Sequence, residues 1–288
     1  MKISEAFDLY KNNYMFVKGM SIRVLENQDY VKNRMVKILG DMDISEITMD
    51  DISKWVRAIQ DMTLSDGTKR KRAVNTIRND LIRVKMVFKY VRLIGEKCLD
   101  PELMPIPRRE DIERPYLSAE EVSRMIDCAY SLRNKLIISL FYSSGIRLSE
   151  LISLNRDSIQ DRQFQVVGKG KKARLCFIDY RTEALMNEYL ETRDDNCPAL
   201  IVSNMYKARM TPTNIQLIIK NSAERAGIKK NVSPHILRHS FATNFIQNNG
   251  NIRHLSTLMG HVSMNTTAIY THIVNNDLKS QYMQFHTI

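Results

Sequence analysis

The sequence predicts a mainly helical protein of two domains, with one small β-sheet in the second domain. At 288 residues the chain exceeds the roughly 100 to 200 residues of a usual single domain. Apolar residues recur at helical spacing through most of the first hundred residues and again after residue 211. Between these regions, residues 164–178 hold two apolar-rich stretches around a turn rich in Gly and Lys, which is typical of a β-hairpin.

The first hundred residues predict four helices in order along the chain. Residues 4–17 and 21–39 form the first two, and Thr48 with Asp51 makes a capping box that opens the third. The fourth covers residues 73–93 and carries the clearest apolar stripe. That stripe consists of Ile77, Leu81, Val84, Phe88 and Val91.

A polar, proline-bearing segment follows these helices and disfavours continuous helix. We therefore expect a helical domain at residues 1–100, a linker at 101–116 and a second domain at 117–288. In the second domain, Ser118 and Glu121 form another capping box. A further helix is expected at residues 135–142, ahead of the hairpin.

The charge balance favours a polyanionic partner. The net charge of +11 suits nucleic acid, because each neutralised phosphate releases condensed counterions. No stretch approaches the roughly 20 apolar residues that span a bilayer, and the first residues begin no signal peptide, so a cytoplasmic protein is expected. The four cysteines form no Cys-x-x-Cys pair, which disfavours a zinc ribbon.

Basic residues of the first domain are candidates for contacts with the DNA backbone, which supply affinity without reading sequence. Four of them precede the fourth helix, and three lie one residue after positions of its apolar stripe. They are Lys69, Arg70, Lys71 and Arg72, followed by Arg78, Lys85 and Lys89. A solvated helix flank explains the same pattern, so both interpretations stay open.

Two cationic positions stand out near the middle of the chain. Arg147 comes two residues after Gly145 and has Glu150 three residues on, on the same helical face, where the carboxylate could orient its neighbourhood. A guanidinium suits phosphate because it stays charged and offers paired donors, although Arg-x-x-Glu is also typical of a surface ion pair. Lys169 lies between two glycines at the hairpin tip. The tip lacks the hydroxyl of a P-loop and, taken alone, is a basic turn.

His235 and Arg238 are one helical turn apart and so share a face. Acid–base and phosphate-binding groups would then converge. His235 and His239 also have the spacing of a zinc pair, but Ile236 stands where the protease motif requires Glu, so no metal site is expected.

His261 follows Gly260, and Tyr270 comes nine residues later. A phenol with a pKa near 10 is a poor nucleophile at neutral pH unless a base and nearby cations stabilise the phenolate. Arg147, Arg238 and Lys169 would supply the cations. Other tyrosines are available for such a role, namely Tyr142, Tyr180, Tyr206 and Tyr282.

Taken in order, these positions resemble the signature of the tyrosine recombinase family. The set is Arg147, Lys169, His235, Arg238, His261 and Tyr270. Residues 233–270, including Pro-His-Ile-Leu-Arg-His-Ser-Phe-Ala-Thr, look especially like the Xer branch and its close integrase relatives. The resemblance covers essentially the whole chain. It implies a SAM-like DNA-binding domain and a catalytic domain of the tyrosine recombinase fold that form a C-shaped clamp on double-stranded DNA.

The resemblance also implies roles for the residues. Tyr270 would attack the scissile phosphate, forming a 3′-phosphotyrosyl bond and a free 5′-hydroxyl. Arg147 and Arg238 would hold the non-bridging oxygens with help from His261. Lys169 would protonate the leaving oxygen, and His235 would assist proton movement at the tyrosine. Glu150 would support the site, and neither metal, ATP nor another cofactor is expected.

Family members act in assemblies, so the resemblance implies a tetramer on DNA, of identical chains or with a paralogous recombinase, that passes through a Holliday junction. The tail at residues 275–288 fits a coupling helix. Its apolar face packs either on a neighbouring subunit or on its own domain; that face is made of Leu278, Tyr282 and Phe285.

Four functions compete at this point. Xer-like resolution of chromosome or plasmid dimers and integration of a mobile element share one chemistry. The chain begins almost directly with the helical domain, which favours the Xer-like role. A type IB topoisomerase is disfavoured by the chain length and the Xer-like motifs. A non-catalytic DNA-binding regulator is disfavoured because all six polar positions are retained.

Overall fold

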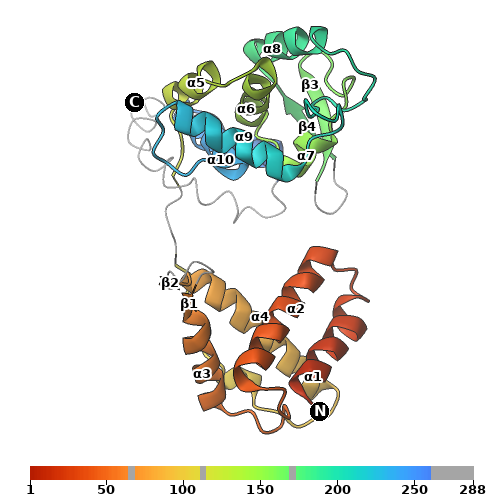
Figure 1. Ribbon diagram of the computed structural model, residues 1–288, viewed down its shortest axis with the longest axis vertical. Helices are drawn as coiled ribbons and strands as arrows, with labels where there is room; N and C mark the ends of the chain where they lie inside the picture. Colours follow the sequence, from red (N-terminus) through yellow and green to blue (C-terminus); the bar gives the residue numbers. More distant parts are fainter. Residues whose placement is uncertain (64–68, 111–114, 169–172, 261–288) are drawn as a thin grey trace, which may run out of the picture. The chain divides into compact units, whose positions relative to one another are not determined.

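A computed structural model of the chain describes residues 1–63, 69–110, 115–168 and 173–260. The chain divides into two units, Met1–Ile112 and Glu113–Ile288, each with its own hydrophobic core. Figure 1 colours the first unit red to yellow and the second yellow-green to blue. The mainly helical character expected from the sequence is confirmed.

The first unit is built of packed helices (Figure 1). Its elements are α1 (Ile3–Tyr10), the π-helix η1 (Lys11–Met15), α2 (Ile22–Leu39), α3 (Met49–Gln60), β1 (Asp61–Thr63), β2 (Lys69–Lys71), α4 (Val74–Leu93) and the 3₁₀-helix η2 (Pro101–Leu103). Thr48 caps α3, since its hydroxyl accepts from the Asp51 amide at 3.3 Å and the Asp51 carboxylate accepts from the Thr48 amide at 3.0 Å. The apolar stripe of α4 is buried along its whole length, as its spacing predicts.

Two features of the first unit differ from the expectations. β1 and β2 pair antiparallel, with Asp61 opposite Lys71, although no strand was expected there, because Asp and Lys are uncommon in strands. Met104, expected in the linker, is buried in the core of this unit. Its apolar side chain is buried there, although the surrounding sequence is polar and proline-rich.

The second unit surrounds one buried helix. Its elements are α5 (Ala119–Asp127), α6 (Leu132–Ser144), α7 (Leu148–Ser153), β3 (Gln163–Val167), β4 (Ala173–Phe177), α8 (Tyr180–Glu191), α9 (Pro212–Arg225), α10 (Pro234–Gln247) and α11 (Ile252–Met259). α6 contacts α5, α8, α9 and α10, so consecutive residues from Leu136 to Phe141 are buried on every side (Figure 1). The expected hairpin is confirmed as β3 paired antiparallel with β4.

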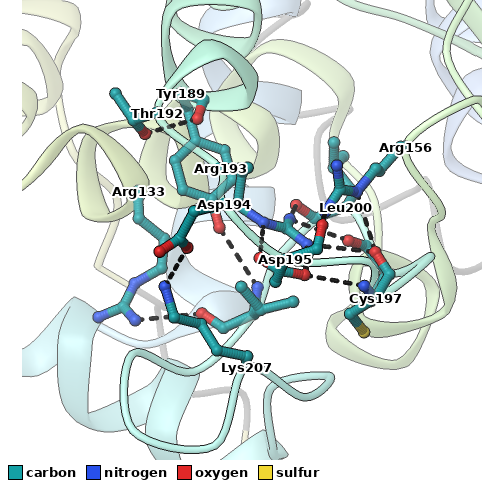
Figure 2. A network of polar contacts seen from close by, with 12 residues as sticks. Arg133, Arg156, Tyr189, Thr192, Arg193, Asp194, Asp195, Cys197, Leu200 and Lys207 are labelled. Atoms are coloured by element: carbon teal, nitrogen blue, oxygen red, sulfur yellow. Dashed lines mark hydrogen bonds and ion pairs between the residues drawn. The ribbon is translucent and has the colours of Figure 1, made fainter.

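A polar network anchors the loop after α8 (Figure 2). Arg193 donates to both carboxylate oxygens of Asp195, at 2.5 and 2.6 Å, and to the carbonyl oxygens of Ala199 and Leu200. Arg156 also donates to Asp195, at 3.0 Å. The side chains of Arg193 and Asp195 are almost completely buried. Because this pair is held away from water, it fixes the conformation of the loop.

Because each unit has its own core, we expect the two units to unfold independently. Trp55, the one tryptophan of the chain, is fully buried in the first unit and reports on its unfolding. Phe88→Ala removes a fully buried ring there and should lower the unfolding free energy followed by Trp55 fluorescence by about 3 to 5 kcal/mol. The matched change Leu136→Ala, in the second core, should shift the circular dichroism transition and leave the fluorescence transition in place. Equal shifts of the Trp55 transition by both variants would show that the two units unfold as one.

Candidate active site

A tight turn after α6 sets the position of Arg147. Gly145 ends the helix with a positive φ of 61°, and a Cβ there would lie 2.4 Å from the Phe241 ring, so glycine is needed for both reasons. Ile146 is then buried, and Arg147 caps α7. About a third of the Arg147 side chain stays exposed. The turn therefore holds its guanidinium at the surface while the backbone beside it is fixed.

Glu150 is a buried carboxylate that receives four hydrogen bonds. Arg147 donates to it from the backbone at 2.7 Å and from Nη1 at 2.9 Å. Arg174, on β4, donates to both of its oxygens, at 2.7 and 2.6 Å. Burial alone would raise the pKa of Glu150, but the hydrogen bonds from Arg174 and Arg147 outweigh it and lower the pKa to about 2. Glu150 is therefore ionised and orients Arg147, as its spacing suggested.

Arg238 lies on α10 and is almost completely buried. Its guanidinium donates to the carbonyl oxygen of Gly145, and to that of Met259 at 2.5 Å. Ser233 caps this helix, with its hydroxyl accepting from the Ile236 amide at 3.4 Å. The cap fixes the first turn, where His235 is exposed on the helix that carries Arg238.

The guanidinium groups meet at the last turn of α11. Arg147 Nη2 donates to the carbonyl oxygens of Met259 and Gly260, at 3.4 and 3.3 Å, and Arg238 shares the Met259 oxygen. Arg174 Nε donates to the Leu258 carbonyl at 2.8 Å. The last carbonyls of a helix lack intrahelical partners and carry partial negative charge, which suits cations. Among the described residues, three guanidinium groups surround one carboxylate, and this excess of positive charge suits an anion such as phosphate.

Three residues of the expected set lie outside the described residues: Lys169, His261 and Tyr270. The described neighbours of these residues are ordered elements. Lys169 lies in the sequence between β3 and β4, which pair antiparallel. Gly260 ends α11 in the left-handed region, directly before His261 in the sequence. The expected tail helix also falls outside the described ranges.

Arg174 belongs to this cluster and was not among the residues expected from the sequence. The signal was present in the alternation of β4, where Arg174 and Cys176 fall on the buried face between exposed neighbours. An arginine on the inward face of a strand requires a buried acceptor. The sequence spacing pairs Glu150 with Arg147, three residues before it, and does not indicate the more distant Arg174 as a second partner.

The basic candidates of the first unit lie in several settings. Lys69, Arg70 and Lys71 form strand β2. Arg72 pairs with the buried Asp80 at 3.3 Å, whereas Lys85 and Lys89 pair with Glu102 at 2.9 and 2.7 Å. Arg78 lies half-buried on α4.

The alternative tyrosines differ in their surroundings. The Tyr142 hydroxyl accepts from Asn244 at 2.9 Å, and burial raises the pKa of this phenol, which disfavours a phenolate. Tyr180 and Tyr206 are mostly exposed. The ring of Tyr180 stacks under the Arg162 guanidinium, 3.8 Å from the ring centroid. Tyr282 lies outside the described ranges.

Other kinds of site were sought in the same part of the chain. Over the ranges that the structure describes, no group of three or more His, Cys, Asp or Glu side chains could hold a metal ion. Nor does any helix in those ranges combine the length and apolar character required to cross a bilayer.

Comparisons with known proteins agree with one another. The sequence profile of the phage integrase family matches residues 115–276. Tyrosine recombinase XerC of Vibrio parahaemolyticus is 28% identical over 280 residues, which cover 93% of this chain and 88% of the relative. Tyrosine recombinase XerD of Oceanobacillus iheyensis is 34% identical over 200 residues, which cover 65% of this chain and 67% of the relative.

Solved structures show the same fold. The Tn1549 transposon integrase in complex with transposon right end DNA superposes with a TM-score of 0.79 at 14% identity, covering 99% of both chains. A lambda integrase dimer bound to a core site gives 0.76 at 15% identity, covering 94% of this chain and 95% of the other. With the family profile spanning more than half of the sequence, the protein belongs to the phage integrase family of tyrosine recombinases, enzymes that break and rejoin DNA.

Proposed function

We propose that this recombinase uses Tyr270 as its nucleophile and that it resolves chromosome or plasmid dimers in the manner of the Xer proteins. One observation carries the catalytic part: Arg147 and Arg238 donate to the same Met259 carbonyl oxygen, so a single anion can engage both. The bonds of Arg147 to the helix end are long, at 3.3 and 3.4 Å, and about a third of its side chain is exposed. A scissile phosphate takes the place of these weak acceptors.

The proposed chemistry combines the arginine cluster with Lys169, His235, His261 and Tyr270. The phenolate oxygen of Tyr270 attacks phosphorus, the bond to the 5′-oxygen breaks, and a 3′-phosphotyrosyl bond forms. Lys169 gives a proton to the departing 5′-oxygen, while His235 assists proton movement at the tyrosine. Arg147, Arg238 and His261 hold the non-bridging oxygens and stabilise the charge that grows on the phosphorane. Rejoining is the reverse attack by a 5′-hydroxyl.

The biological role rests on the relatives. XerC and XerD proteins match most of the chain at 26–34% identity in the examples compared. Four protomers hold two DNA duplexes and exchange strands through a Holliday junction. Integration of a mobile element is the second candidate, because integrases bound to DNA share the fold.

Tyr270→Phe should abolish covalent attachment, because it removes the attacking oxygen and little else. The binding site is first selected from randomised duplexes and built into a nicked suicide substrate. The protein is incubated with this substrate in the presence of EDTA, and covalent adducts are detected by denaturing electrophoresis. Tyr206→Phe, at an exposed tyrosine, is the matched control and should form the adduct at the wild-type level. Binding of that site by the wild-type protein without any adduct would instead favour the non-catalytic regulator.

Arg238→Lys should slow single-turnover cleavage by about 10²- to 10³-fold, the usual cost of losing one donor to a developing oxyanion. Lysine keeps the charge but cannot span two acceptors and a phosphate oxygen as the planar guanidinium does. DNA affinity should change far less than the rate. The control Arg225→Lys, at an exposed position on α9, should cleave normally. Equal losses of rate and affinity would argue against a role in the transition state.

Deletion of the gene should raise the fraction of multimeric plasmids or chromosomes in its host, measured by gel electrophoresis of intact DNA. Complementation with the wild-type gene should restore monomers, and complementation with Tyr270→Phe should not. If multimers stay at the wild-type level while excision of a mobile element is lost, the integrase role is correct.

A further inference from the structure

Arg174 is buried and fully engaged within the second unit. Only 8% of the residue is exposed. Its Nη1 and Nη2 bind the two oxygens of Glu150, and its Nε binds the Leu258 carbonyl at 2.8 Å. Unlike Arg238, which donates to carbonyl oxygens, Arg174 has its charge paired with a buried carboxylate, so it is poorly placed to bind a DNA phosphate as well. Any contribution to the reaction therefore passes through the groups that it contacts.

Glu150 is shared unequally between its two arginines. Arg174 occupies both carboxylate oxygens through its side chain, whereas Arg147 uses only Nη1 from its guanidinium. Arg147 Nη2 is directed to the end of α11 instead. If Arg174 were absent, the negative charge of Glu150 would fall on Arg147 alone. The carboxylate would then neutralise Arg147 and draw its second nitrogen away from the anion position.

Arg174 also fixes the end of α11. A Cβ built on Gly260 would lie 2.7 Å from Arg174 Cδ, so the arginine stem packs directly against that glycine. Together with the hydrogen bond to Leu258, this contact sets the last turn of the helix, where Arg147 and Arg238 meet. One side chain thus connects β4, α7 and α11.

We propose that Arg174 is a positioning residue for DNA cleavage: by balancing the charge of Glu150 and bracing the end of α11, it keeps the Arg147 guanidinium free to bind the scissile phosphate. This inference rests on the proposed role of Arg147 at the phosphate. Arg174 would act through Arg147 and the end of α11, which makes it a positioning residue and not a catalytic one.

The test compares Arg174→Met and Arg174→Lys with wild type in single-turnover cleavage of the nicked suicide substrate. Arg174→Met should lower the rate by about 10- to 100-fold, the range found when an outer partner of an active-site group is lost. Arg174→Lys keeps the positive charge and should lower the cleavage rate less than Arg174→Met does. Thermal unfolding confirms that each variant is folded at the assay temperature, and DNA binding is measured separately.

A second substrate separates positioning from mere stability. A methylphosphonate at the scissile position carries no negative charge, so a correctly placed guanidinium matters less to its cleavage. On this substrate the ratio of the wild-type rate to the Arg174→Met rate should fall to less than about 3-fold. In an Arg147→Lys background, Arg174→Met should reduce the cleavage rate of the ordinary substrate by a similarly small factor, because the effects of two residues that act through one group are not additive. A purely structural role gives the same ratio throughout.

Arg193→Met is the matched control, because Arg193 is an equally buried arginine that grips a carboxylate and carbonyl oxygens away from the cluster (Figure 2). Its variant should lose stability and keep the wild-type cleavage rate per folded molecule on both substrates. Wild-type cleavage by Arg174→Met, or an unchanged ratio on the methylphosphonate, would overturn the inference and leave the proposed function standing. Failure of the wild-type protein to form any adduct would overturn both.

Discussion

A buried carboxylate is the constraint on which this catalytic unit depends. Glu150 is almost inaccessible to water, and an unpaired charge there would be too costly for a stable fold. Its pairing requires Arg147 from the start of α7 and Arg174 from β4. Because Arg174 also binds the end of α11, satisfying one carboxylate brings together a helix start, a strand and a helix end. The positions of Arg147 and of the end of α11, to which Arg238 also donates, follow from that requirement.

The same arrangement explains how a protein keeps several cations together before DNA arrives. Guanidinium groups in one place repel each other unless acceptors surround them. Here the carbonyls of α11 and of Gly145 serve as those acceptors for Arg238 and Arg147. Backbone carbonyls are neutral dipoles, so they hold the cations in place without cancelling their charge. The cluster stays electropositive, which is the condition for stabilising a phosphorane.

Much of the helical scaffold could be predicted from local signals. Thr48 and Ser118 begin their helices as their capping boxes indicate, and the α4 stripe is buried as its spacing requires. β1 and β2 could not be predicted, because each has only three residues, too few to show an alternating pattern, and Asp61, Lys69 and Lys71 are of types uncommon in strands. Glu150 and Arg174 are 24 residues apart in the sequence, and the local sequence around either residue does not indicate that the two form a hydrogen-bonded pair. Arg174 was therefore missed, even though the alternation along β4 placed it on the buried face.

Two ion pairs, one in each unit, differ sharply in their burial. Lys89 and Glu102 are substantially exposed, and surface pairs of this kind contribute only about 0 to 1 kcal/mol. DNA phosphates can replace Glu102 at little cost, so such a pair suits a residue that binds and releases a backbone. The pair of Arg174 with Glu150 is buried on both sides, and no solvent or phosphate can substitute for either partner. Arg238 is equally buried but donates to neutral carbonyl oxygens, so the carboxylate partner of Arg174, and not burial alone, sets its structural role apart.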